Sequence, residues 1–63
     1  MNIGENMKMI RESRNISQCE LAERIYVRQS TICQIERGTR ALTLPLAVQI
    51  TKVLDCTIDD LIA

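Results

Sequence analysis

The side chains best suited to recognition chemistry lie in one short segment, residues 27–37. If this segment is a helix, successive side chains are rotated by about 100°. One side of the helix then carries Thr31, Ile32 and Ile35. The opposite side carries polar, uncharged or cationic groups, formed by Gln29, Ser30, Cys33, Gln34 and Arg37. We predict that the first side faces a core and the second side faces a partner.

The polar side offers the hydrogen-bonding groups that recognise DNA. Amides, hydroxyls and guanidinium groups bind base edges and phosphate oxygens, whereas an ordinary solvated helix face mixes Glu and Lys. A glutamine amide pairs with adenine through two hydrogen bonds, and we expect this chemistry of Gln29 and Gln34. The alternative is that both glutamines are helix-forming residues on a solvated face. The composition of the whole side favours DNA contact.

Arg28 stands immediately before this segment, where a cation is locally unfavourable. It opposes the helix dipole by roughly 0.3–1 kcal/mol, and the missing capping side chain costs about 1 kcal/mol more. A nearby phosphate or guanine would reverse the sign of this effect. We therefore expect Arg28 to contact DNA, with a solvent-directed side chain as the alternative.

The three cysteines match no metal or disulfide pattern. Cys19, Cys33 and Cys56 are odd in number, form no C-x-x-C pair and are accompanied by no histidine. Zinc sites and disulfide frameworks need closer sets of ligands, so we predict free thiols and no cofactor. Cys33 is expected to be a small contact residue at the DNA surface, and a redox- or metal-sensing thiol is the alternative.

Net charge alone counts against nucleic-acid binding. Eight Lys and Arg balance eight Asp and Glu, whereas DNA-binding domains are usually basic. The distribution is polarised, however: residues 28–40 carry three arginines and one glutamate, a net of +2, and residues 41–63 carry one lysine and three aspartates, a net of −2. A basic surface can therefore coexist with an acidic end. No membrane-span or secretory-signal pattern occurs, and we expect a cytoplasmic protein.

The elements that position these residues are marked by capping patterns. A capping side chain stands three residues before a carboxylate in three pairs: Asn2 with Glu5, Ser17 with Glu20, and Thr57 with Asp60. Together with apolar periodicity they predict helices over residues 3–14, 18–24, 29–37, 44–54 and 58–62. Asn15 and Gly38 are expected to end the first and third helices in the left-handed conformation, and Pro45 fits the first turn of the fourth.

Only residues 25–27 separate the second and third helices, and so short a link makes them cross steeply as a helix-turn-helix over about residues 18–37. We predict one all-helical domain, residues 1–63. Its expected core is Ile3, Met7, Ile10, Leu21, Ala22, Ile25, Val27, Ile32, Ile35, Leu44, Ile50, Leu54, Ile58 and Leu61.

A domain of 63 residues buries only about 60% of the surface of its unfolded chain, so its stability is marginal without further support. Several apolar residues exceed what the core needs, among them Met9 and Leu42. Leu46 and Val53 lie seven apart on one face of the fourth helix, and Ile62 lies in the fifth. We predict that these three residues form a homodimer interface, with isolated surface residues as the alternative.

The sequence resembles the phage repressor/Cro-type, or XRE-type, helix-turn-helix family over residues 3–62. The matching stretches are Ile3-Gly4-Glu5-Asn6, Ile10-Arg11-Glu12, Ile16-Ser17-Gln18, Glu20-Leu21-Ala22-Glu23, Ser30-Thr31-Ile32, Ile35-Glu36-Arg37-Gly38, Ile50 with Lys52, and Asp59 with Leu61. The resemblance implies a five-helix bundle whose third helix enters the major groove, usually as a dimer on a two-fold operator.

The resemblance also implies roles for single residues. Gln18 matches a glutamine that contacts a phosphate, Arg40 matches a basic loop position at the DNA backbone, and Arg37 is expected there as well. Arg11 and Glu36 match a buried ion pair between the first and third helices. The positions that face base edges are matched by Gln29, Ser30, Cys33 and Gln34.

Four positions depart from the family pattern. Tyr26 and Asp55 stand where glycine is common, Arg28 replaces a Ser or Thr cap, and Leu42 replaces a proline. Because a positive φ strains a tyrosine, Tyr26 indicates a different turn, and we also expect its hydroxyl to reach a phosphate.

The function predicted from these observations is a sequence-specific, double-stranded DNA-binding transcriptional regulator, a repressor that reads a palindromic operator as a homodimer. A protein-interaction module or antitoxin-like partner on the same fold is the alternative. An enzyme is disfavoured because no nucleophile–base pair, metal cluster or phosphate-binding glycine loop is present. No small-molecule ligand is expected.

Overall fold

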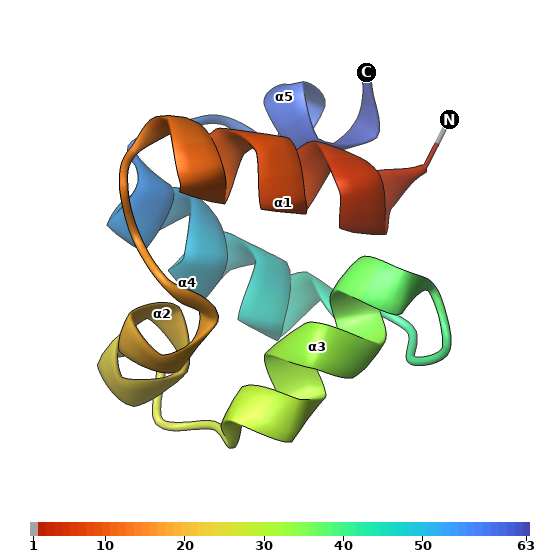
Figure 1. Ribbon diagram of the computed structural model, residues 1–63. Coiled ribbons are helices and arrows are strands. Elements are labelled where there is room, and N and C mark those ends of the chain that lie inside the picture. The colour runs from red at the N-terminus through yellow and green to blue at the C-terminus, as the bar shows by residue number, and fades with distance from the viewer. Residues whose placement is uncertain (1) are drawn as a thin grey trace.

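The computed structural model describes residues 2–63, which form five helices and no strand (Figure 1). The helices are α1 Ile3–Ser13, α2 Gln18–Arg24, α3 Gln29–Arg37, α4 Leu44–Leu54 and α5 Ile58–Ile62. The all-helical prediction is confirmed, and the predicted bounds differ only at the end of α1, which is one residue shorter.

Short polar side chains begin three of the helices. Asn2 and Ser17 each accept a hydrogen bond from the backbone N–H three residues further on, at 3.1 and 3.0 Å. Thr57 and Asp60 form a reciprocal capping box, with bonds of 3.1 and 2.9 Å. The bond from the Thr57 backbone N–H is the main reason why the pKa of the Asp60 carboxyl is lowered. α3 begins after Arg28 with no side-chain cap.

Four residues adopt the left-handed backbone conformation. Asn15 and Gly38, with φ of 59° and 83°, end α1 and α3 as predicted. Tyr26 and Asp55 have φ of 59° and 54°, so both keep the conformation that glycine adopts most easily. The expectation of a different turn at Tyr26 is therefore wrong. Each non-glycine residue pays roughly 1–2 kcal/mol for this conformation.

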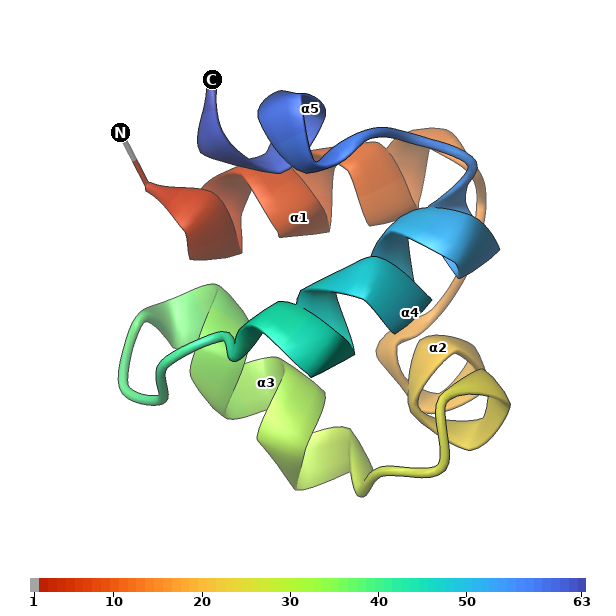
Figure 2. The same ribbon diagram turned by 180° about the vertical axis from the view of Figure 1, so that it is seen from behind.

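The helices are arranged so that α2 and α3 lie at one end of the molecule and α1 and α5 at the other, with α4 between them (Figures 1 and 2). α3 packs against both α2 and α1, and α5 packs against α1. A side chain of α1 and the residue just after it bind the ends of the later helices. Arg14 Nε donates to the Leu54 carbonyl at 2.9 Å, and Asn6 Nδ2 donates to the Leu61 carbonyl at 2.8 Å.

The core collects apolar side chains from all parts of this arrangement: Met7, Leu21, Ala22, Ile25, Ile32, Ile35, Ala47, Ile50, Leu54 and Leu61. Ile3, Ile10, Val27 and Ile58 were also predicted there, and they are half-buried. Leu44 was predicted to be buried, but it is 68% exposed. The buried side of α4 is centred between Ala47 and Ile50, and at about 100° per residue Leu44 lies at its edge in the first turn.

Gly4 sets how closely α1 approaches α3. It is buried, and a Cβ atom there would collide with the Ile35 carbonyl oxygen and lie 2.8 Å from the Glu36 carbonyl oxygen. Both neighbours are backbone atoms, which cannot rotate away. The absence of a side chain therefore lets the first turn of α1 rest directly on the last turn of α3.

Candidate nucleic-acid interface

The second helix of the helix-turn-helix, α3, is tied to α1 by a buried ion pair. Arg11 Nε donates to Glu36 Oε2 at 2.8 Å and an Arg11 terminal nitrogen donates to Glu36 Oε1 at 3.2 Å. The side chains are only 8% and 3% exposed. The hydrogen bond to Glu36 raises the pKa of Arg11 further above its usual range. The remaining terminal nitrogen binds the Ile16 carbonyl at 2.7 Å.

Gln18, the expected phosphate contact, joins the same network from the start of α2. Its Nε2 donates to Glu36 Oε1 at 2.9 Å, and the side chain is half-buried. One amide hydrogen is therefore used inside the protein. Within residues 2–63 the amide oxygen has no hydrogen-bond donor, so it and the second amide hydrogen are available at the surface.

The predicted recognition side chains of α3 gather on the side opposite the core. Ile32 and Ile35 are buried, at 0% and 2% exposure, whereas Cys33, on the polar side, is half-buried. Arg28 is exposed at the start of the helix. The exposed members of this side are Gln29, Ser30, Gln34 and Arg37. We call these four residues with Arg28 and Cys33 the α3 surface.

The α3 surface contains no carboxylate. The one acidic residue of α3 is Glu36, and its side chain is buried in the ion pair with Arg11. The fold therefore removes the negative charge of this helix from the side that carries Arg28 and Arg37. A neutral chain thus presents a locally cationic surface.

The loop after Gly38 folds back onto Gln34. The Thr39 backbone N–H and hydroxyl donate to the Gln34 backbone carbonyl at 2.9 and 3.2 Å. Arg40 Nε donates to the Gln34 side-chain oxygen Oε1 at 2.8 Å. These contacts bring Arg40 beside the α3 surface, a pairing that the sequence pattern does not predict.

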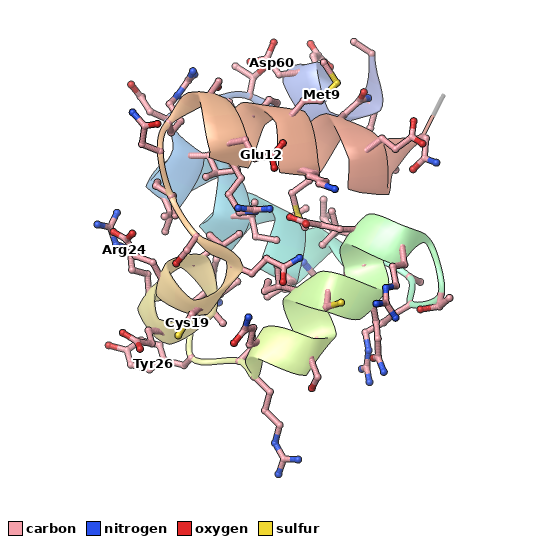
Figure 3. The ribbon with its side chains drawn as sticks, in the orientation of Figure 1. Met9, Glu12, Cys19, Arg24, Tyr26 and Asp60 are labelled. Atoms are coloured by element: carbon pink, nitrogen blue, oxygen red, sulfur yellow. The ribbon has the colours of Figure 1, made fainter. Side chains whose placement is uncertain are left out.

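Tyr26 lies in the turn between α2 and α3 and is 93% exposed (Figure 3). Its ring therefore contributes almost nothing to the core, although its backbone conformation is costly. The combination leaves the ring and hydroxyl free to meet a partner beside the helix-turn-helix.

The cysteines are free thiols in different parts of the fold. Cys19 is exposed on α2, and its hydrogen bond to Glu23 at 3.5 Å raises the pKa of the thiol. Burial raises the pKa of Cys56. Within residues 2–63 no group of three or more His, Cys, Asp or Glu residues is arranged to hold a metal, and no helix is long and apolar enough to cross a bilayer.

The apolar surface of α4 differs from the prediction. Leu46 and Val53 are half-buried and pack against the core, so they do not exceed its needs. Leu44 and Val48, four residues apart, are the exposed apolar side chains of this helix, at 68% and 39%. Ile62 of α5 is 42% exposed and is therefore accessible to a partner, as the predicted dimer interface requires.

A family model described as helix-turn-helix matches residues 7–61, which span α2, α3 and most of the chain around them. The chain belongs to the XRE-type helix-turn-helix family. An uncharacterised HTH-type transcriptional regulator of Archaeoglobus fulgidus is 38% identical over 55 residues, which cover 87% of this chain and 78% of the relative.

Two solved structures resemble the XRE-type fold of this chain closely. The restriction-modification controller protein C.AhdI of Aeromonas hydrophila has a TM-score of 0.90 at 25% identity, covering 95% of this chain and 91% of its own. SinR, the master regulator for biofilm formation solved in complex with DNA, has a TM-score of 0.89 at 29% identity, with coverages of 97% and 98%. This XRE-type protein is a DNA-binding transcriptional regulator and not an enzyme.

Proposed function

We propose that this XRE-type regulator represses transcription by binding a specific palindromic operator as a homodimer, with α3 of each protomer in the major groove. The observation that carries the proposal is the α3 surface. It offers amide, hydroxyl and guanidinium donors, and the one carboxylate of the helix is buried. Such groups bind base edges and phosphates, whereas an exposed carboxylate would repel the DNA backbone.

In this proposal the base edges are contacted by Gln29, Ser30, Cys33, Gln34 and Arg28. Phosphates are bound by Gln18 and Arg37, and by Tyr26 from the turn. Gln18 suits this role because its amide is held by Glu36 and is therefore ordered before DNA arrives. A side chain that is already ordered loses less conformational entropy on binding.

The proposed dimer uses the exposed apolar side chains of α4 and α5. Ile62 is kept from the interface predicted from the sequence, and Leu44 and Val48 take the place of Leu46 and Val53, which pack partly against the core. A two-fold pair of helix-turn-helix domains on DNA places its recognition helices about 34 Å apart. The described part of one protomer measures 25 × 23 × 20 Å, a size at which two adjacent protomers can meet this spacing.

The DNA-binding proposal is tested by selecting bound sequences from a pool of random DNA duplexes at moderate salt. Wild type is expected to enrich a palindrome, and Gln29→Ala/Gln34→Ala is expected to lose it. Gln49→Ala, an exposed glutamine of α4, is the control and should enrich the same palindrome. If folded wild-type protein enriches no sequence, the proposed function is wrong and a protein partner becomes the better explanation of the fold.

The dimer is tested by sedimentation of Leu44→Glu/Val48→Glu beside wild type. We expect wild type to sediment as a dimer and the double variant as a monomer that still binds one half-site weakly. Met9→Glu, at an exposed position of α1, should stay dimeric. A dimer that survives in the double variant would show that the interface lies elsewhere.

A further inference from the structure

The two glutamines of the α3 surface have different surroundings. Within residues 2–63 the Gln29 side chain has no protein hydrogen-bond partner, whereas Gln34 Oε1 accepts a bond of 2.8 Å from Arg40 Nε. The loop that carries Arg40 is held in place by the two bonds from Thr39 to the Gln34 backbone carbonyl. Gln34 and Arg40 are thus one unit built from α3 and the loop that follows it.

This pairing changes what Gln34 offers to a base. A glutamine binds adenine by accepting from N6–H₂ with its oxygen while donating to N7 with its nitrogen. In the Gln34–Arg40 pair, the Arg40 guanidinium already donates to that oxygen, so only one of its two lone pairs is left, and it lies beside a cation. Apart from that one lone pair, the groups that the pair can offer to DNA are the Gln34 amide hydrogens and the terminal N–H groups of Arg40, all of which are donors.

We propose that the Gln34–Arg40 pair reads guanine and discriminates against adenine. The inference rests on the proposed function, and it replaces the adenine pairing expected for Gln34 from the sequence alone. Guanine presents two acceptors, O6 and N7, in the major groove, and these match a cationic pair whose hydrogen-bonding groups are mainly donors. Thymine presents one acceptor, O4, so we expect it to be the base bound next best after guanine.

Electrostatics acts in the same direction. The amino hydrogens of adenine and cytosine are partially positive, and to reach Gln34 Oε1 they would have to approach a guanidinium that is hydrogen-bonded to the same atom. The carbonyl oxygen of guanine is attracted by that cation. Gln29 has no such neighbour in the described structure, so it can still form two hydrogen bonds with adenine. The two glutamines of one helix therefore select different bases.

Arg40 was expected to contact only the DNA backbone. If it left Gln34 and bound a phosphate, the glutamine oxygen would be released and adenine would become its preferred base. The identity of the base opposite Gln34 therefore reports whether the pair persists on DNA.

The experiment is a selection from random DNA duplexes with wild type, Gln34→Ala, Arg40→Met and Arg37→Met. The base pair read by Gln34 is the one whose preference disappears in Gln34→Ala. We expect guanine there for wild type, by about tenfold over adenine, which lies within the range of one bidentate contact. Arg40→Met, which removes the guanidinium but keeps the length of the chain, should shift that preference to adenine.

Arg37→Met is the matched control, because Arg37 is also an exposed arginine near the end of α3. It loses the same charge, so affinity should fall while guanine is kept. Circular dichroism verifies that every variant is folded, and Arg40 is itself an exposed loop residue. The wild-type preference tests the inference independently of the variants.

Three results would overturn the inference and leave the proposed function intact: adenine preferred by wild type at this position, no position that depends on Gln34, or a uniform loss of affinity in Arg40→Met with unchanged preference. The last result identifies Arg40 as a phosphate contact only. If folded wild-type protein enriches no sequence, the proposed function itself fails, and the inference fails with it.

Discussion

Removing the carboxylate of Glu36 is predicted to be the most damaging single change at the junction of α1, α2 and α3. The carboxylate accepts three hydrogen bonds, two from Arg11 at 2.8 and 3.2 Å and one from Gln18 at 2.9 Å. In Glu36→Ala, the buried Arg11 guanidinium keeps only its bond to the Ile16 carbonyl. An uncompensated buried charge costs about 3–5 kcal/mol.

The expected loss is large compared with the whole stability of so small a domain. At about 0.05–0.15 kcal/mol per residue, a chain of 63 residues unfolds with roughly 3–9 kcal/mol. A loss of 3 kcal/mol corresponds to a fall in the thermal midpoint of about 12 °C or more. The assay is urea and thermal unfolding followed by circular dichroism, with wild type and variant at the same protein concentration.

A double variant separates the charge from the packing. Arg11→Met/Glu36→Leu removes both charges and fills similar volume, so it should recover most of the stability that Glu36→Ala loses. Glu20→Ala is the control, because Glu20 forms an exposed ion pair with Arg24 at 2.8 Å and should cost less than about 1 kcal/mol. The reasoning is refuted if Glu36→Ala costs no more than Glu20→Ala, or if the double variant is as unstable as the single one.

Three further predictions concern the backbone at Gly4 and Tyr26 and the cap at the start of α5. Gly4→Ala should lower the thermal midpoint, because overpacking against backbone carbonyls costs about 1–3 kcal/mol and outweighs a gain in helix propensity of about 1 kcal/mol; an unchanged midpoint would show that α1 shifts freely. Tyr26→Gly should raise the unfolding free energy, by at most about 1 kcal/mol, and weaken operator binding; unchanged binding would remove Tyr26 from the interface. Asp60→Asn should be less stable than wild type at neutral pH. Because folding lowers the pKa of the Asp60 carboxyl from 3.8, its contribution is present above that value and disappears as the pH falls through the folded pKa, where the two unfolding curves should converge.

Much of the local structure was predictable because it depends on near neighbours in the chain. Caps such as Ser17 and Thr57 bond to groups three residues away, and Gly38 adopts its left-handed conformation within its own turn. The bounds of the helices follow from such contacts. The identity of the α3 surface was also predictable, because a helix of known period separates Ile32 and Ile35 from Gln29 and Gln34.

What the sequence did not determine depends on contacts between distant segments or on folded loops. Leu44 and Ala47 both fit an apolar side of α4, and only the packing of the bundle decides that Ala47 is buried and Leu44 is exposed. Tyr26 adopts a left-handed conformation in the turn that joins α2 to α3, and these two helices pack against each other.

The sequence by itself determined an all-helical chain with a helix-turn-helix and a polar side on α3, because helix periodicity and capping are local. Tertiary structure decided which groups on that side are available. It buries the Glu36 carboxylate against Arg11, and it places Arg40 on the Gln34 oxygen. The physical reason is that a side chain can offer a partner only those donors and acceptors that are not already hydrogen-bonded within the protein. Here those internal bonds come from other elements of the fold.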